Sequence, residues 1–136
     1  MSAEEREVEQ ERRHIEGMLN VKCPRCEMVF MDFANCAALT CGQAGCGAAF
    51  CAWCQEDCGD DAHNHVAHCA AKPPGADTFY DTTGEFMIVQ RQRQRVAITD
   101  YFQNEVRGSI RARVVDAVRV VLTDSGIGDV CVRFAA

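Results

Sequence analysis

Cysteine is the residue that most constrains this chain: it accounts for ten of the 136 residues, and nine of the ten fall between Cys23 and Cys69. A segment so rich in thiols is either cross-linked by disulfides or folded around metal ions. The N-terminal residues are charged and lack the apolar stretch of a secretory signal, and no apolar run is long enough to span a bilayer. We therefore expect a cytoplasmic protein with no membrane partner, whose thiols stay reduced and free to bind zinc.

The spacing of the cysteines predicts two zinc ions in two separate sites. Two Cys-x-x-Cys turns, beginning at Cys23 and Cys51, each bring a pair of thiolates to one side of a tight loop. Tetrahedral zinc needs two further ligands for each turn. One site can be built from Cys23, Cys26, Cys41 and Cys46. The other begins with Cys51 and Cys54 and draws its last two ligands from Cys58, Cys69 and the histidines at 63, 65 and 68. Cys36 is then left without a metal to bind.

Charge argues against nucleic acid as a partner. The formal net charge is −6, and a four-thiolate zinc site adds negative charge because each ligand loses its proton. The cysteine-rich section has few basic residues, namely Lys22, Arg25 and Lys72. It offers no face for a phosphate backbone. The arginines nearer the C-terminus are interpreted as a solvated helix face.

Hydrophobic and turn patterns predict a small zinc-stabilised α+β module, with two sequential zinc sites and short strands, followed by an α-helical segment. Residues 1–20 form an N-terminal helix capped by Ser2 and Glu5. Residues 21–72 form the zinc module, with strand pieces at 28–31 and 48–51. Residues 73–81, which contain a tandem proline, form a linker.

Residues 82–136 are predicted to be helical. Thr82 and Glu85 form a second capping box. Two apolar faces repeat at helical spacing: the first consists of Ile98, Tyr101, Phe102 and Val106, and the second of Ile110, Val114, Val118, Val121 and Leu122. Both faces are interpreted as core or helix–helix contacts. Cys131, far from the other thiols in sequence, is expected to be a small buried hydrophobe.

The order and spacing of the cysteines over residues 23–54 resemble those of the second RING (Rcat) of RING-between-RING ubiquitin ligases. The seven positions are Cys23, Cys26, Cys36, Cys41, Cys46, Cys51 and Cys54. The local sequence agrees, with Cys-Pro-x-Cys at the start and Phe-Cys-Ala-Trp-Cys at the end. The resemblance implies that both zinc ions are structural. Related modules finish with a histidine and then a cysteine about four residues on, which favours His65 and Cys69 as the last ligands over the rival pair Cys58 and His63.

The resemblance also implies a catalytic role for Cys36. In that family the cysteine at this position accepts ubiquitin as a thioester from a conjugating enzyme and passes it to a lysine of a protein substrate. Active members usually carry a histidine as general base two positions later and often a carboxylate two before the second Cys-x-x-Cys turn. This chain has Ala38 and Ala49 there, and Ala34-Asn35 in place of a Gly-Gly lead-in. His63 and His68 are alternative bases. The alternative function is a non-catalytic zinc module that binds ubiquitin or another protein.

Overall fold

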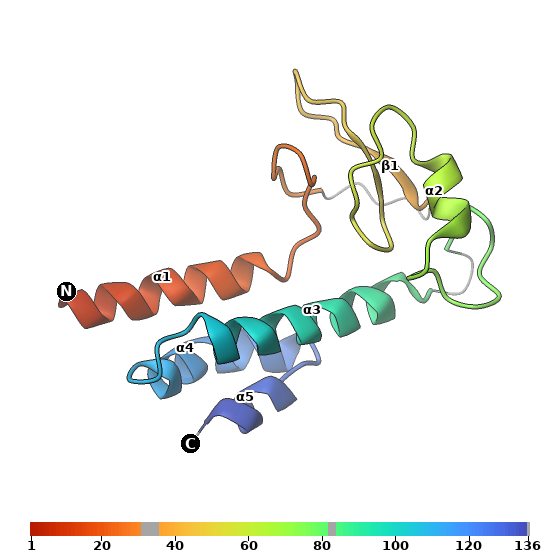
Figure 1. The fold of residues 1–136 in the computed structure, drawn as a ribbon. Coiled ribbons are helices and arrows are strands. Elements are labelled where there is room, and N and C mark those ends of the chain that lie inside the picture. Colours follow the sequence, from red (N-terminus) through yellow and green to blue (C-terminus); the bar gives the residue numbers. More distant parts are fainter. Residues whose placement is uncertain (31–35, 82–83, 136) are drawn as a thin grey trace. The chain divides into compact units, whose positions relative to one another are not determined.

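The computed structural model describes residues 1–30, 36–81 and 84–135 (Figure 1). Along the chain it contains α1 (Ala3–Gly17), β1 (Ala38–Thr40), β2 (Ala49–Cys51), α2 (His63–His68), α3 (Phe86–Asn104), α4 (Arg111–Asp124) and α5 (Asp129–Phe134). The chain divides into two compact units. The helical unit combines Met1–Leu19 with the chain from Arg91 onward, and the cysteine-rich unit is Asn20–Gln90. Helix α3 therefore begins in the cysteine-rich unit and continues into the helical unit.

The helical unit is built on the apolar faces that the sequence predicted. Ile98, Phe102, Val106 and Cys131 are all buried, as expected, and Ile15 brings α1 into the same core. The remaining buried members are Ile110, Val114, Val115, Val118, Leu122, Ile127 and Val130. The cap of α1 is also confirmed, since the Ser2 hydroxyl accepts a hydrogen bond from the Glu5 N–H at 3.0 Å. Among the described residues, no helix is long and apolar enough to cross a bilayer.

Helix α5 lies within the segment 82–136 that was predicted to be helical, but the sequence did not locate it as a separate helix, because six residues are too few to show a helical repeat. Gly126, with a φ of +79°, ends α4 in the left-handed conformation that favours glycine. Two residues later, a Cβ added at Gly128 would lie 2.8 Å from the Thr123 hydroxyl oxygen. The two glycines thus allow the chain to turn closely around the end of α4 and add α5 to the same core.

In the described residues of the cysteine-rich unit, β1 pairs with β2 as a short antiparallel hairpin, with Leu39 opposite Phe50. The strand predicted at 48–51 is confirmed by β2, but the strand predicted at 28–31 is wrong for its described part. Met28 and Phe30 lie outside any strand, and Val29 makes only an isolated bridge to Lys22. Met28 and Val29 directly follow the first Cys-x-x-Cys turn and remain exposed. No burial against a partner strand therefore selects an extended strand at these residues.

The segment before α3 is tied to the cysteine-rich unit. The Phe79 carbonyl accepts a hydrogen bond from the Ala37 N–H at 2.6 Å, and Tyr80 forms an antiparallel bridge with Cys36. Asp81 then accepts hydrogen bonds from the N–H groups of Glu85 and Phe86, at 3.0 and 3.1 Å, at the start of α3. Thr82, which the sequence proposed as a cap for this helix, lies outside the described residues. Part of the predicted linker is thus paired with the chain beside Cys36.

Candidate metal centres

The structure brings eight side chains together as two groups of four, with the same membership that the sequence predicted. In each group the four possible ligand atoms all lie within 4.8 Å of one another. The first group is Cys23, Cys26, Cys41 and Cys46, and the second is Cys51, Cys54, His65 and Cys69. In the first, the Sγ atoms of Cys23 and Cys46 are 3.7 Å apart and those of Cys26 and Cys41 are 3.6 Å apart. In the second, Cys54 Sγ lies 3.1 Å from His65 Nε2. Each group could hold one metal ion.

The two Cys-x-x-Cys turns adopt the same backbone conformation. In each, the residue after the second cysteine is left-handed, with a φ of +64° at Glu27 and +61° at Gln55. That residue donates its N–H to the carbonyl of the first cysteine, at 2.9 Å in the first turn and 2.7 Å in the second. Non-glycine residues rarely adopt this conformation. Because it occurs at the equivalent residue of both turns, we attribute this left-handed conformation to the close approach of the two thiols in each turn.

Backbone N–H groups surround the sulfur of Cys23 in the first group. Burial alone raises the pKa of this thiol, but hydrogen bonds from the backbone of Cys26 and Arg25 and from Cys46 lower its pKa to about 7. A thiol with that pKa is about half ionised at neutral pH, and the thiolate is the form that binds metal. The first group therefore contains one sulfur that is prepared to bind a cation.

The second group is more deeply buried. Burial raises the pKa of the Cys51 thiol to about 12, although N–H groups of Cys54 and Trp53 hydrogen-bond to its sulfur. His65 is oriented by a carboxylate: its Nδ1 lies 3.0 Å from Glu56 Oε2, while its Nε2 points at Cys54. A carboxylate on the far ring nitrogen fixes the tautomer and the orientation of a metal-binding histidine. His65 thus has a hydrogen-bond partner on the ring nitrogen that faces away from the cysteines, as metal-bound histidines generally do.

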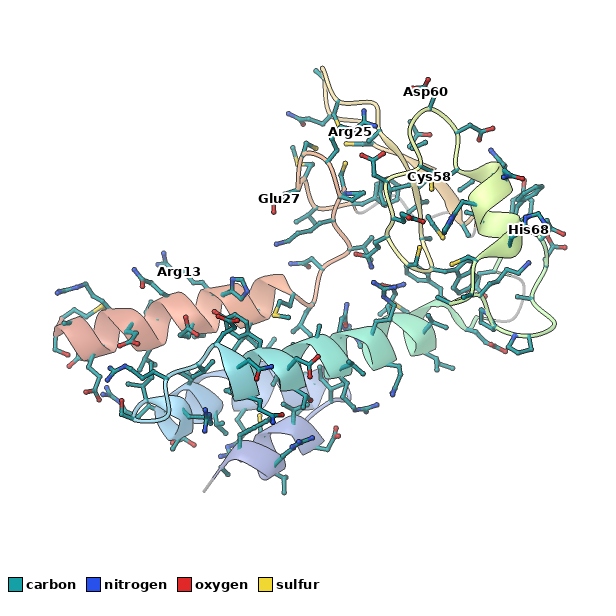
Figure 2. The ribbon with its side chains drawn as sticks, viewed as in Figure 1. Arg13, Arg25, Glu27, Cys58, Asp60 and His68 are labelled. Carbon is teal, nitrogen blue, oxygen red and sulfur yellow. The ribbon has the colours of Figure 1, made fainter. Side chains whose placement is uncertain are left out.

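An ion pair connects the first Cys-x-x-Cys turn to the loop after the second. Arg25 makes two hydrogen bonds of 3.0 Å to Asp57, and the N–H of Gly59 donates to the same carboxylate at 2.9 Å (Figure 2 labels Arg25). The guanidinium and the Gly59 N–H together lower the pKa of Asp57. Because the pair is exposed, it contributes little to the free energy of folding. Its main effect is to link the two loops.

Three side chains that the sequence left open join neither group within the described ranges. Cys58 donates to the Glu56 carbonyl at 3.3 Å, and the His63 ring pairs with Asp61 at 2.5 Å. The exposed His68 ring contacts the Asn64 carbonyl at 3.0 Å (Figure 2). The rival pair Cys58 and His63 is therefore not the one that the structure assembles. Asp61 also accepts the His63 N–H at 3.1 Å, just before α2, whose N-cap residue is Ala62.

Cys36 lies outside both groups and is half-buried. Its neighbour Ala37 is held on two sides, because its N–H donates to Phe79 and its carbonyl accepts from the Ala52 N–H at 2.8 Å. Ala38 and Ala49, the two positions at which the sequence lacks a base and a carboxylate, lie in β1 and β2. Ala34 and Asn35 lie outside the described residues. The backbone beside Cys36 is therefore hydrogen-bonded to the second Cys-x-x-Cys turn.

Comparison of the chain with family models, curated proteins and solved structures finds no match. The members of both groups were predicted from cysteine spacing and, for His65 and Cys69, from the family resemblance, but Glu56 and Gln90 were missed. Glu56 lies two residues after Cys54 and looks in sequence like any exposed acidic residue. Nothing in the sequence marks it as a contact of His65. Gln90 lies in α3, far along the chain from the turn that it contacts.

Proposed function

We propose that the chain binds two zinc ions and serves as the catalytic module of a RING-between-RING-type ubiquitin ligase. The donor sets, four thiolates in one group and three thiolates with an imidazole in the other, are those of closed structural zinc sites. When bound, zinc supplies folding free energy, of the order of 10 kcal/mol for structural sites in small domains. The eight side chains would hold the ions, and the residues outside them would carry the chemistry.

The observation that best supports a catalytic role is the position of Cys36. It is a half-buried thiol that neither metal group uses, next to a residue bonded to the second Cys-x-x-Cys turn. Closed zinc sites do not react with substrate, so a reactive cysteine must be separate from them. A partly accessible thiol on a braced backbone meets the requirement for a nucleophile.

The proposed transfer takes place in two steps. The Cys36 thiolate attacks the carbonyl carbon of the thioester that joins ubiquitin to the conjugating enzyme. A new carbon–sulfur bond forms, and the cysteine of the conjugating enzyme leaves as a thiolate. The amine of a substrate lysine then attacks the new thioester, an amide bond forms, and Cys36 leaves as a thiolate while the amine proton passes to a base. Because Ala38 carries no base, we expect this second step to be slow unless His63, His68, solvent or the substrate takes the proton.

The second candidate function is a zinc-built protein-interaction module without catalysis. Ala38 and Ala49 favour it, because both positions lie in the hairpin next to Cys36 and neither side chain can accept a proton. In this case Cys36 would be a bystander, and the folded surface of the cysteine-rich unit would bind ubiquitin or another protein.

A charging assay distinguishes the two functions. Zinc-loaded full chain is mixed with ubiquitin-loaded conjugating enzyme, with a first RING supplied separately, and the products are separated without reducing agent. We expect a thiol-sensitive ubiquitin adduct for the wild type and for Cys58→Ala, the matched control at a second cysteine outside both groups. Cys36→Ala should give none. If the wild type also gives none while native mass spectrometry shows two zinc ions, the interaction module is the better description.

A further inference from the structure

Gln90 is a buried amide in the second turn of α3, with 1% of its surface exposed. Its Nε2 donates hydrogen bonds to the Ala52 carbonyl at 2.7 Å and to the Trp53 carbonyl at 3.4 Å. Its Oε1 accepts a hydrogen bond from Gln55 Nε2. A buried amide is costly unless its donors and acceptor are satisfied. Every partner of Gln90 named here comes from the second Cys-x-x-Cys turn or the residue that follows it.

The two carbonyls that Gln90 contacts belong to the same peptide units as two other functional groups. The Ala52 carbonyl shares its peptide plane with the Trp53 N–H, and the Trp53 carbonyl shares its plane with the Cys54 N–H. Those two N–H groups hydrogen-bond to Cys51 Sγ. In a planar trans peptide the C=O and N–H bonds point in opposite directions. Fixing the carbonyls on the Gln90 side therefore fixes the N–H groups on the sulfur side.

A further contact holds α3 on this turn. One helical turn before Gln90, the Phe86 ring packs against Trp53 with ring centroids 6.1 Å apart. The residues between the two cysteines are thus covered by an aromatic side chain and anchored by an amide from the same helix. Residues at positions i and i+4 lie on one face of a helix, so a single face of α3 makes both contacts.

We propose that Gln90 is a positioning residue for the second metal group, holding the two peptide N–H groups on the Cys51 sulfur. Two N–H dipoles directed at a buried thiolate stabilise its negative charge, and hydrogen bonding at the carbonyl end of each peptide strengthens its N–H donor. Gln90 thus completes the second metal centre from outside the cysteine–histidine segment. The inference rests on the metal-binding part of the proposed function and is independent of any reaction at Cys36.

Cobalt substitution provides the test, because Co²⁺ bound by four thiolates and Co²⁺ bound by three thiolates and an imidazole have different visible spectra. The full chain is loaded with Co²⁺, and each site is followed as a competing chelator removes the ion. In Gln90→Met, which keeps the length of the side chain but has no donor, we expect the affinity of the second group to fall about 10- to 100-fold. The first group should be unchanged. Gln92→Met, at an exposed position in the same helix, is the matched control and should behave as wild type.

A second variant keeps the test decisive if Gln90→Met does not fold. Gln55→Asn shortens the side chain that holds the Gln90 amide, and asparagine tolerates the positive φ found at position 55. We expect a several-fold loss of affinity at the second group alone. Equal affinities of the second group in the wild type and in the folded variants would overturn the role of Gln90. A wild-type chain that binds no Co²⁺ at the second group would instead overturn the metal site itself.

Discussion

Cys36 and Tyr80 lie directly opposite each other in an antiparallel bridge, although they come from opposite ends of the cysteine-rich unit. Residues paired in this way place their side chains on the same side, with Cβ atoms about 5 Å apart. The Tyr80 side chain is about half exposed, and Cys36 opposite it is half-buried. We therefore expect the Tyr80 side chain, from the segment before α3, to shield the proposed nucleophile partly from solvent.

Tyr80→Ala should expose the Cys36 thiol. We expect alkylation of Cys36 by iodoacetamide, measured by peptide mass spectrometry on zinc-loaded protein, to become several-fold faster. Tyr80→Phe keeps the ring and should react like the wild type. Cys58 serves as an internal reference whose rate should stay the same in both variants. Equal Cys36 rates in wild type and Tyr80→Ala would show that the ring does not shield the thiol.

Removal of metal should unfold the two units unequally. The core of the cysteine-rich unit includes four of its own predicted ligands, and two more pack against it, whereas the core of the helical unit contains none of them. After chelation we expect loss of the near-ultraviolet signal of Trp53, which lies within the second Cys-x-x-Cys turn, with most of the far-ultraviolet helical signal kept. Restoring zinc should restore the tryptophan signal. Simultaneous loss of both signals would mean that the helical unit cannot stand without the metal.

Leu122→Ala should destabilise the helical unit without affecting metal. Leu122 is completely buried, and truncating such a side chain costs about 2–5 kcal/mol. Val120→Ala lies two residues away at a position that is 73% exposed and should change stability by less than about 0.5 kcal/mol. Chemical denaturation followed by circular dichroism measures both changes. A similar loss in the two variants would argue against the observed core.

The ion pair of Glu7 with Arg107 should make the attachment of α1 depend on pH. The hydrogen bond and charge of Arg107 lower the pKa of Glu7 below 4.5, its ordinary value. A carboxyl whose pKa is lower in the folded state stabilises that state above the unfolded-state pKa, and the benefit is lost as the pH falls through the folded-state pKa. Glu7→Gln should therefore be slightly less stable than wild type at neutral pH.

The difference between Glu7→Gln and the wild type should shrink below pH 4.5 and disappear once Glu7 is protonated in both states. Because the pair is exposed, the effect should also decrease with added salt. Thermal unfolding of the two proteins across this pH range measures it. Glu105→Gln, at an exposed position just after α3 in the same unit, is a suitable control. A difference that persists at low pH would show that the substitution acts by another route.

Much of this protein could be predicted from local sequence patterns. Cysteine spacing indicated both groups of ligands, because a Cys-x-x-Cys turn brings its thiols together without help from distant residues. Helical periodicity located the buried faces around Phe102 and Val118, since the period of a helix is a local property. Ser2 marked the start of α1 for the same reason, as its hydroxyl bonds an N–H three residues away.

Contacts between distant segments could not be read in this way. The sequence placed a strand at 28–31 and missed β1 at Ala38–Thr40, because three-residue strands are selected by their partner and not by their own pattern. Spacing alone also left Cys58 and His63 as rivals of His65 and Cys69 for the second group, and only the family resemblance favoured the latter pair. That choice depended on α2, which turns His65 toward Cys54 while Glu56 holds the other side of its ring.

The sequence by itself therefore determined that the chain would fold around its thiols and which helical faces would be buried. Only the tertiary structure decided what surrounds those thiols: Tyr80 opposite Cys36, and Gln90 on the peptide units behind Cys51. The physical reason is that ligand spacing and amphipathic periods are encoded over a few residues. A buried amide finds its carbonyl partners only after the chain has closed over many residues, and no local pattern records that closure.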